Sequence, residues 1–205
     1  MQVFTYTGFV AALLLGGVVA AVEARPRAES QAPASKSAVS TPFYGNEKCP
    51  ISGKPIDRTK MVELDGQPVF LCCPMCAAKA NADAKGTLAK AYPAAAAIGN
   101  KHCPVSGEAN EDSKAKVTFA GKTVSLCCDD CVADAKKAWA ATIAKASDEK
   151  LADQKNAKCV CGKDVAAAWV AVADGKIYRL CSAACVDDVK KDPKKLAAVS
   201  AAKKS

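Results

Sequence analysis

Residues 71–76 read LCCPMC, and related hexapeptides recur as LCCDDC at 126–131 and LCSAAC at 180–185. In all three, a leucine precedes a cysteine and the last cysteine follows four residues after it. Each hexapeptide also has a glycine six residues before its first cysteine: Gly66, Gly121 and Gly175. Coincidence does not keep such offsets aligned three times, so the chain contains an internal repeat.

The repeat extends further towards the N-terminus. Each copy begins with Asn-x-x-Cys, and the cysteines of these starts are Cys49, Cys103 and Cys159. Each start soon reaches a glycine, in the strings CPISG, CPVSG and CVCG. A cysteine followed closely by glycine is typical of a metal-binding knuckle.

The sequence between the two cysteine groups predicts a β-hairpin. Asp65-Gly66 separates two short apolar runs within residues 61–71, and an Asp-Gly pair in that setting is a strong hairpin signal. Residues 117–126 and 169–180 have the same layout. Good helix formers follow the last cysteine of each copy, so each unit is expected to be a knuckle, a hairpin and a helix.

Cysteine is the unusual component of the composition, because the 205 residues contain twelve cysteines and only 5% aromatic residues. Units of this size, with few large apolar side chains, rarely fold without a metal or disulfide. Four thiolates around one soft cation would supply that link. Three cysteines recur at matching positions of every copy: Cys49, Cys72 and Cys76; Cys103, Cys127 and Cys131; Cys159, Cys181 and Cys185.

The fourth ligand of each unit is less well defined. Cys161 stands opposite Ser52 and Ser106 and is predicted to be a ligand, whereas Ser182 stands opposite Cys73 and Cys128. Adjacent cysteines such as Cys72 and Cys73 usually point in different directions. Cys73 and Cys128 are therefore either ligands or helix caps.

Two alternatives to this ligand set remain open. His102, the only histidine, either replaces Cys128 at the second site or is simply exposed. The twelve cysteines could also form six disulfides in an exported protein. Metal is favoured over disulfides, because the thiols repeat in a ligand-like arrangement and each recurring trio leaves one thiol unpaired.

The N-terminus is typical of an export signal. Residues 9–22 are an uninterrupted apolar run, too short for a usual membrane span and suited to a signal peptide cleaved after Ala24. No Lys or Arg precedes the run, so an uncleaved membrane anchor is the alternative. We expect residues 1–24 to be the signal peptide, 25–45 to be a flexible, disordered linker rich in Pro, Ala and Ser, and the mature protein to reside in the periplasm or cell envelope.

The pattern CPxSG, strand–glycine–strand and L-C-C-x-x-C resembles the TRASH and YHS domains, and residues 159–196 are the most similar to YHS. The resemblance implies three tandem zinc-ribbon or treble-clef-like α+β modules, at 46–98, 99–153 and 154–200. These ranges are called repeats 1, 2 and 3 below. It also implies a role in heavy-metal trafficking, buffering or resistance.

The favoured function is therefore an exported metal-binding protein that is not an enzyme. Zinc is the favoured ion and copper(I) the alternative. A zinc- or disulfide-stapled interaction protein of the cell envelope is the second hypothesis. A thiol–disulfide oxidoreductase is the third, because Cys73-Pro-Met-Cys76 has the spacing but no βαβ context. The net charge of +8 is spread among acidic residues, so nucleic acid is not an expected partner.

Overall fold

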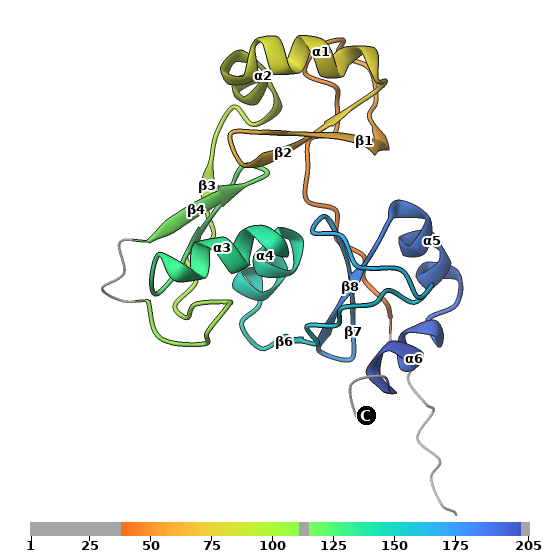
Figure 1. Ribbon diagram of the computed structural model, residues 1–205. Helices are drawn as coiled ribbons and strands as arrows, with labels where there is room; N and C mark the ends of the chain where they lie inside the picture. Colours follow the sequence, from red (N-terminus) through yellow and green to blue (C-terminus); the bar gives the residue numbers. More distant parts are fainter. Residues whose placement is uncertain (1–37, 111–114, 202–205) are drawn as a thin grey trace, which may run out of the picture. The chain divides into compact units, whose positions relative to one another are not determined.

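The computed structural model describes residues 38–110 and 115–201. Over these residues the protein is a mixed α+β structure with six short helices and three small sheets (Figure 1), which confirms the expected class at this coarse level. The predicted signal peptide, the alternative anchor and residues 25–37 of the predicted linker lie outside the described residues. None of the helices in the described ranges has both the length and the apolar character needed to cross a membrane.

Each repeat contains the predicted antiparallel hairpin. In repeat 1, β1 (Asp57–Leu64) pairs with β2 (Gln67–Leu71). The turn residues Asp65 and Gly66 have φ angles of 48° and 76°, which is the left-handed pair that a tight type I′ hairpin turn requires. The corresponding strands are β4 (Lys116–Phe119) and β5 (Lys122–Ser125) in repeat 2, and β7 (Trp169–Ala173) and β8 (Lys176–Leu180) in repeat 3.

Two short helices follow each hairpin, where the sequence predicts one. The predicted helix of repeat 1 is broken at Asp83. The side chain of Asp83 accepts a hydrogen bond from the backbone N–H of Gly86 at 2.9 Å and caps a second helix. In repeat 3 the break falls at Asp192-Pro193, where proline has no N–H to continue the first helix. The pairs are α1 (Met75–Ala82) and α2 (Ala84–Ala91), α3 (Asp130–Lys137) and α4 (Trp139–Ser147), and α5 (Ala183–Lys191) and α6 (Lys195–Ala201).

The last residues of repeats 1 and 2 form short strands that the sequence does not predict. β3 (Ala96–Ala97) pairs in parallel with β5, and β6 (Ala152–Asp153) pairs in parallel with β8. The strand orders are therefore β3-β5-β4 and β6-β8-β7 in repeats 2 and 3, against β1-β2 in repeat 1. The last residues assigned to one repeat thus belong to the sheet of the next.

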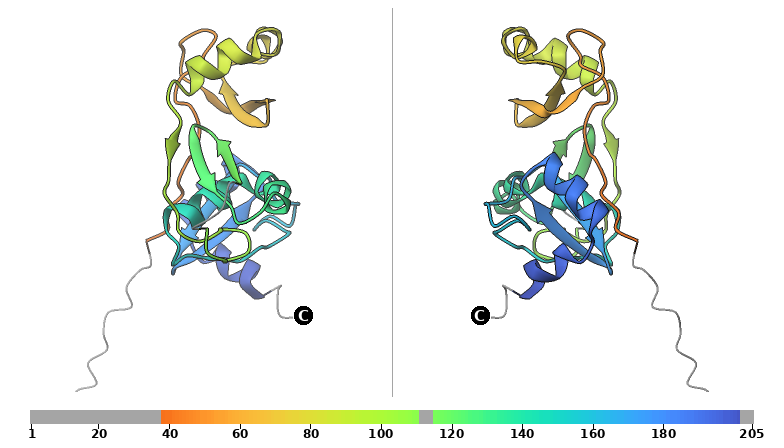
Figure 2. Two further views of the ribbon diagram at one scale, coloured as in Figure 1. Left: turned by 90° about the vertical axis from the view of Figure 1, so that its left-hand side faces the viewer. Right: turned by 90° about the vertical axis from the view of Figure 1, so that its right-hand side faces the viewer.

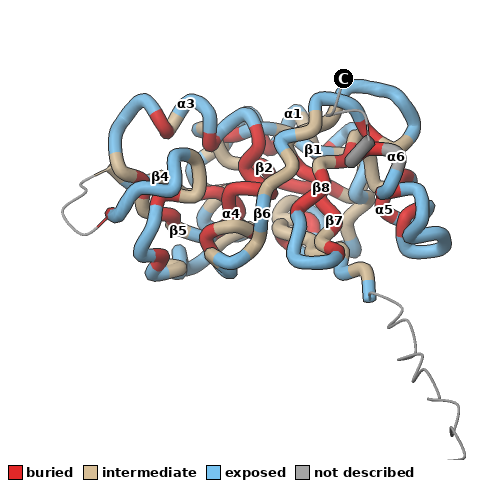
Figure 3. Tube along the Cα trace, turned by 90° about the horizontal axis from the view of Figure 1, so that it is seen from below, coloured by how far each residue is buried: buried red, intermediate tan, exposed pale blue. Residues whose placement is uncertain are grey.

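Buried apolar side chains form two groups of very different size. A small core in repeat 1 consists of Cys49, Leu64, Val69, Leu71, Cys76 and Ala80. Figure 2 shows α1 and α2 on one side of the β1–β2 hairpin, which supplies half of these residues. A large core contains both tryptophans, Trp139 and Trp169, and most of the buried residues of repeats 2 and 3. Figure 3 shows buried residues running along β2 and β8.

Residues 38–45, the last part of the predicted flexible linker, are packed. Ser40 exchanges two backbone hydrogen bonds with Val172 of β7, at 2.9 and 2.7 Å. The ring of Phe43 lies 4.9 Å from that of Phe70 and 6.1 Å from that of Trp169. An aromatic side chain at the end of a polar linker can be buried, and its packing fixes the residues around it.

Candidate metal centres

The knuckle of each repeat is closed by backbone hydrogen bonds around its glycine. In repeat 1, the N–H of Gly53 donates to the carbonyl of Cys49 at 2.8 Å, and the N–H of Cys49 donates to the carbonyl of Lys54 at 2.8 Å. Gly53 has a φ of 71°, which a residue with a Cβ rarely adopts. Cys103 with Gly107 and Cys159 with Gly162 make the same closure. The glycine therefore bends the chain so that each first cysteine faces inwards.

The asparagine of Asn-x-x-Cys joins the knuckle to the second hairpin strand. The Asn46 side chain donates to the carbonyls of Lys48 and Phe70, at 2.8 and 2.7 Å, and accepts from the N–H of Phe70 at 2.8 Å. Asn100 and Asn156 make the equivalent bonds, to the residue two positions before Cys127 and Cys181 respectively. The sequence shows that this asparagine recurs, but its role as a clamp depends on contacts more than 20 residues away.

We expect Asn46→Ala to lower the stability of repeat 1 by about 3 kcal/mol, because it leaves the buried polar groups of Phe70 without their partner. The measurement is the urea midpoint of the metal-loaded chain, followed by the amide exchange of β1 and β2. Asn81→Ala is the control, because Asn81 is exposed on α1 and its replacement should change stability by at most about 0.5 kcal/mol. Equal midpoints for the two variants would contradict the clamp.

The sulfur atoms of the nine recurring cysteines converge in three groups. Cys49, Cys72 and Cys76 form one, Cys103, Cys127 and Cys131 the second, and Cys159, Cys181 and Cys185, with Cys161, the third. Within each group every sulfur lies within 4.8 Å of every other. These groups are called sites 1, 2 and 3. The predicted ligands from the knuckle, the strand end and the helix start therefore do come together.

The sulfur separations fit a shared cation. The Sγ atoms of Cys72 and Cys76 are 3.7 Å apart, and the corresponding distances are 3.6 Å at site 2 and 3.4 Å at site 3. A tetrahedron with metal–sulfur bonds of about 2.3 Å has sulfur–sulfur edges of about 3.8 Å, whereas a disulfide bond is about 2.05 Å long. All twelve cysteines lie in the described residues and are free thiols there.

The fourth position differs among the sites. At site 3 the Sγ of Cys161 lies 3.3 Å from that of Cys181, so four sulfurs converge. At sites 1 and 2 the equivalent place is held by a hydroxyl, with Ser52 Oγ 3.1 Å from Cys72 Sγ and Ser106 Oγ 3.2 Å from Cys127 Sγ. The alignment places these serines opposite Cys161, but their contact with sulfur is visible only in the fold.

The sulfurs of Cys73 and Cys128 each lie next to two of the three sulfurs of the adjacent site. Cys73 Sγ is 3.7 Å from Cys72 Sγ and 3.6 Å from Cys76 Sγ, yet it does not belong to the group in which all sulfurs are mutually close. Cys128 repeats this relation to Cys127 and Cys131, at 3.7 and 3.5 Å. Ser182, their counterpart in repeat 3, instead caps α5 by accepting a hydrogen bond from the N–H of Cys185.

His102 is directed to a carboxylate and is not part of the sulfur group of site 2. Its Nδ1 lies 2.8 Å from Glu149 Oε2, and its backbone N–H donates to Glu149 Oε1 at 3.0 Å. These hydrogen bonds lower the pKa of Glu149 to about 2. Of the two alternatives for His102, the structure favours an exposed side chain hydrogen-bonded to Glu149 over ligation in place of Cys128.

Within each site the thiols differ in how readily they ionise. Burial raises the pKa of Cys49, but hydrogen bonds from Ser52 and from backbone groups outweigh it and bring the pKa down to about 6. Burial raises the pKa of Cys76 to about 12, and the neighbouring thiols add to the rise. Cys103 and Cys131 differ in the same directions at site 2. Two adjacent thiolates repel each other, and a cation among the sulfurs removes that repulsion.

The last thiol of each group also lies at a helix start, as predicted. Cys76, Cys131 and Cys185 fall in the first turns of α1, α3 and α5. Free N–H groups and the helix dipole at this end favour a thiolate over a thiol. At Cys76, Cys131 and Cys185 this effect opposes the rise in pKa caused by burial but does not overcome it, so a bound cation is needed to keep these thiols ionised.

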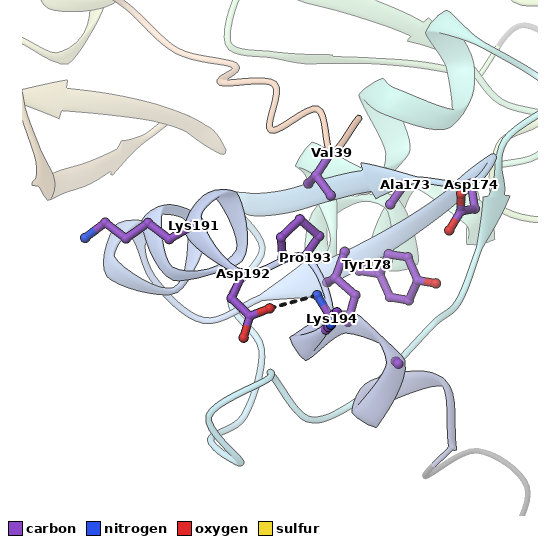
Figure 4. Close-up of a pocket in the computed structure, with 10 residues that line it drawn as sticks. Val39, Ala173, Asp174, Tyr178, Lys191, Asp192, Pro193 and Lys194 are labelled. Carbon is purple, nitrogen blue, oxygen red and sulfur yellow. Dashed lines mark hydrogen bonds between the residues drawn. The ribbon is translucent and has the colours of Figure 1, made fainter. Parts of the chain in front are cut away.

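A cavity of about 740 Å³ lies apart from the thiol sites. Its lining includes Val39, Tyr178, Pro193 and Leu196 (Figure 4). The side chain of Asp192 accepts a hydrogen bond from the N–H of Lys194 at 3.2 Å beside it. No cysteine is among the described residues that line it, so the sulfur chemistry takes place elsewhere.

Three clusters of cysteine sulfurs at metal-binding distances are thus the chemical feature that the described structure offers. Comparison with protein-family models, with curated proteins and with solved structures gives no match for this chain.

Proposed function

We propose that this protein is an exported, non-enzymatic metal-binding protein that holds thiophilic ions, Zn(II) or Cu(I), in three thiolate sites and serves metal trafficking, buffering or resistance. The observation that carries the proposal is the convergence of three separate sulfur groups, each within 4.8 Å. Soft thiolates select Zn(II) and Cu(I) over hard cations such as Mg²⁺ and Ca²⁺.

The arrangement of each site supports this assignment. Two of the shared sulfurs come from the strand end and the helix start, four residues apart, and the third comes from a knuckle more than 20 residues earlier. One ion would therefore join three parts of a unit with little apolar core. Zinc-ribbon and treble-clef modules are held together by a metal ion in this way. We propose the TRASH/YHS assignment on the same residues.

Export is proposed on the apolar run at residues 9–22. A reducing compartment is not needed for the proposal, because a metal–sulfur bond uses a lone pair of the thiolate and so lowers its reactivity towards oxidants. The periplasm or cell envelope is the proposed location.

The test is elemental analysis of the full chain purified without added metal, with thiol counts before and after denaturation. We expect about three Zn or Cu ions per chain, one for each sulfur group. We also expect thiols that react slowly until the chain is denatured. A metal-free chain with no reactive thiol after denaturation would instead show disulfides and contradict the proposal.

A structural role for the metal is the second candidate, and the small core of repeat 1 favours it. Four residues besides the two cysteines make up that core, which is little for an independent unit. The two roles differ in what metal loss does: a buffer stays folded or refolds readily, whereas a structural zinc protein loses a partner-binding surface.

The oxidoreductase hypothesis has a direct test as well. Cys73 Sγ lies 3.6 Å from Cys76 Sγ, but repeat 3 has Ser182 in place of the first cysteine of this pair. We expect the full chain to reduce insulin disulfides no faster than free dithiothreitol. Faster reduction that is lost in Cys73→Ser would replace our proposal with a redox function.

A further inference from the structure

The three sites have two different ligand sets. Site 3 brings four sulfurs together, those of Cys159, Cys161, Cys181 and Cys185. Sites 1 and 2 bring three sulfurs together and have a serine hydroxyl in the fourth place, at 3.1 Å and 3.2 Å from the nearest sulfur. Among the three tandem repeats, repeat 3 thus carries a site with four thiolates, whereas repeats 1 and 2 carry sites with three.

A serine hydroxyl is a poor substitute for a thiolate. It is neutral at ordinary pH and presents a hard oxygen, whereas thiophilic ions prefer soft, charged sulfur. A site with four thiolates is closed, while one with three strong ligands leaves a position that an external ligand can occupy. Sites 1 and 2 are therefore open on the side of Ser52 and Ser106.

A further cysteine stands next to each open site and is missing from the closed one. Cys73 is partly exposed and Cys128 is exposed. Each has its sulfur within 3.5–3.7 Å of two sulfurs of the adjacent site. Either sulfur can enter or leave the coordination shell while the three converging thiolates stay in place. At site 3, Ser182 holds this position and its hydroxyl caps α5.

We infer that sites 1 and 2 exchange their ions with external thiolate ligands through Cys73 and Cys128, whereas site 3 retains its ion. The inference rests on the proposed metal-binding function and adds that the three sites differ in how fast they exchange their ions. The exchange partner is a thiol donor, either a small thiol or a cysteine side chain of another protein.

The exchange step involves no change of oxidation state. An incoming thiol gives up its proton and forms a metal–sulfur bond at the open position. Cys73 or Cys128 then leaves the metal as a thiolate and takes up a proton. Repetition of this step transfers the ion to the incoming ligands, and the protein thiolates that are released take up protons or bind another ion.

The experiment uses the full chain loaded with three equivalents of Zn(II), mixed with glutathione and the zinc indicator 4-(2-pyridylazo)resorcinol. We expect two equivalents to leave in a fast phase and one in a phase slower by about tenfold or more, which corresponds to a barrier difference of at least about 1.4 kcal/mol. Cys73→Ser with Cys128→Ser should slow the fast phase and leave the stoichiometry at three.

Matched substitutions exchange the two kinds of site. Ser52→Cys with Ser106→Cys gives sites 1 and 2 the fourth thiolate, so both equivalents should move to the slow phase. Cys161→Ser with Ser182→Cys gives site 3 the residues of the other two sites, so its equivalent should leave in the fast phase. ¹¹³Cd NMR of the cadmium-loaded chain gives a second readout, because the resonance position reports how many thiolates bind the ion; we expect one resonance of the four-sulfur type and two of another type.

Release of all three equivalents at one rate in the wild-type chain would overturn the inference, and so would unchanged rates in Ser52→Cys with Ser106→Cys. Three cadmium resonances of the same four-sulfur type would also overturn it, because Cys73 and Cys128 would then be permanent ligands. If the proposed metal-binding function is wrong, the chain binds no ion at the loading step, and this result is distinct from all of those above.

Discussion

We expect a strong chelator to unfold repeat 1 of the metal-loaded chain while repeats 2 and 3 keep most of their strands and helices. The small core of repeat 1 has six buried residues, and two of them, Cys49 and Cys76, are proposed ligands. Repeats 2 and 3 share the large core that contains Trp139 and Trp169. In zinc-finger peptides a structural zinc ion contributes about 10–16 kcal/mol, so repeat 1 cannot replace it by apolar burial.

The measurement is amide hydrogen exchange of the full chain before and after chelation. Amides of β1, β2 and α1 should lose nearly all protection when the metal is removed, and those of β7 and β8 should retain it. Val69→Ala and Val170→Ala form a control pair, because both residues are buried strand valines, one in each core. Val69→Ala should have the larger effect on the protection of metal-loaded repeat 1, and Val170→Ala the larger effect on β7 and β8. Persistent protection of β1 and β2 in the metal-free chain would contradict the account.

The second large effect concerns two cysteines that are three residues apart. We expect Cys76→Ser to lower the metal content from three ions per chain to two, and Cys73→Ser to leave it at three. The Cys76 sulfur belongs to the mutually close group of site 1, whereas the Cys73 sulfur lies beside it. Loss of one thiolate from a three-thiolate site leaves too few soft ligands to retain the ion.

Native mass spectrometry of the intact chain measures both stoichiometries directly. Cys131→Ser and Cys128→Ser repeat the comparison at site 2, where the sulfurs have the same relation. Each pair substitutes serine for cysteine within one helix start, so general damage from the substitution is matched. An equal loss of metal in Cys73→Ser and Cys76→Ser would mean that the sulfur of Cys73 is an equal ligand.

Local signals in the sequence predict the hairpins and the sulfur groups well. The turn at Asp65-Gly66 needs two left-handed residues in succession, and Asp-Gly is a pair that adopts this conformation readily. The offset of four residues between Cys72 and Cys76 spans the junction between the end of β2 and the start of α1, which is a local geometry. Such features depend on a few neighbouring residues and so can be deduced from spacing alone.

Features that depend on distant segments are not predicted. The contact of Ser52 with Cys72 and the clamp of Asn46 on Phe70 each join residues 20 or more positions apart. The strands β3 and β6 are only two residues long, and their alanines and aspartate carry no strand signal. They form because the edges of β5 and β8 are free to pair. The local sequence of β3 and β6 does not indicate this pairing.

The sequence predicts one helix in each repeat and leaves the role of Cys73 undecided, and both outcomes have a related cause. Asp83 is compatible with a helix interior or with a cap, and the hydrogen bond to Gly86 decides between the two. Two adjacent cysteines can both reach one centre only with an unusual turn, and the strand-to-helix junction of repeat 1 brings the sulfur of Cys73 near two ligands without joining the group. Backbone conformation at one junction determines the ligand set.

The convergence of thiolates on a shared cation is tested most directly by X-ray absorption of the zinc-loaded full chain. We predict a first shell dominated by sulfur at about 2.3 Å, with three ions per chain. A first shell of nitrogen and oxygen alone at about 2.0–2.1 Å would contradict the account, because the ions would then be bound outside the three cysteine groups.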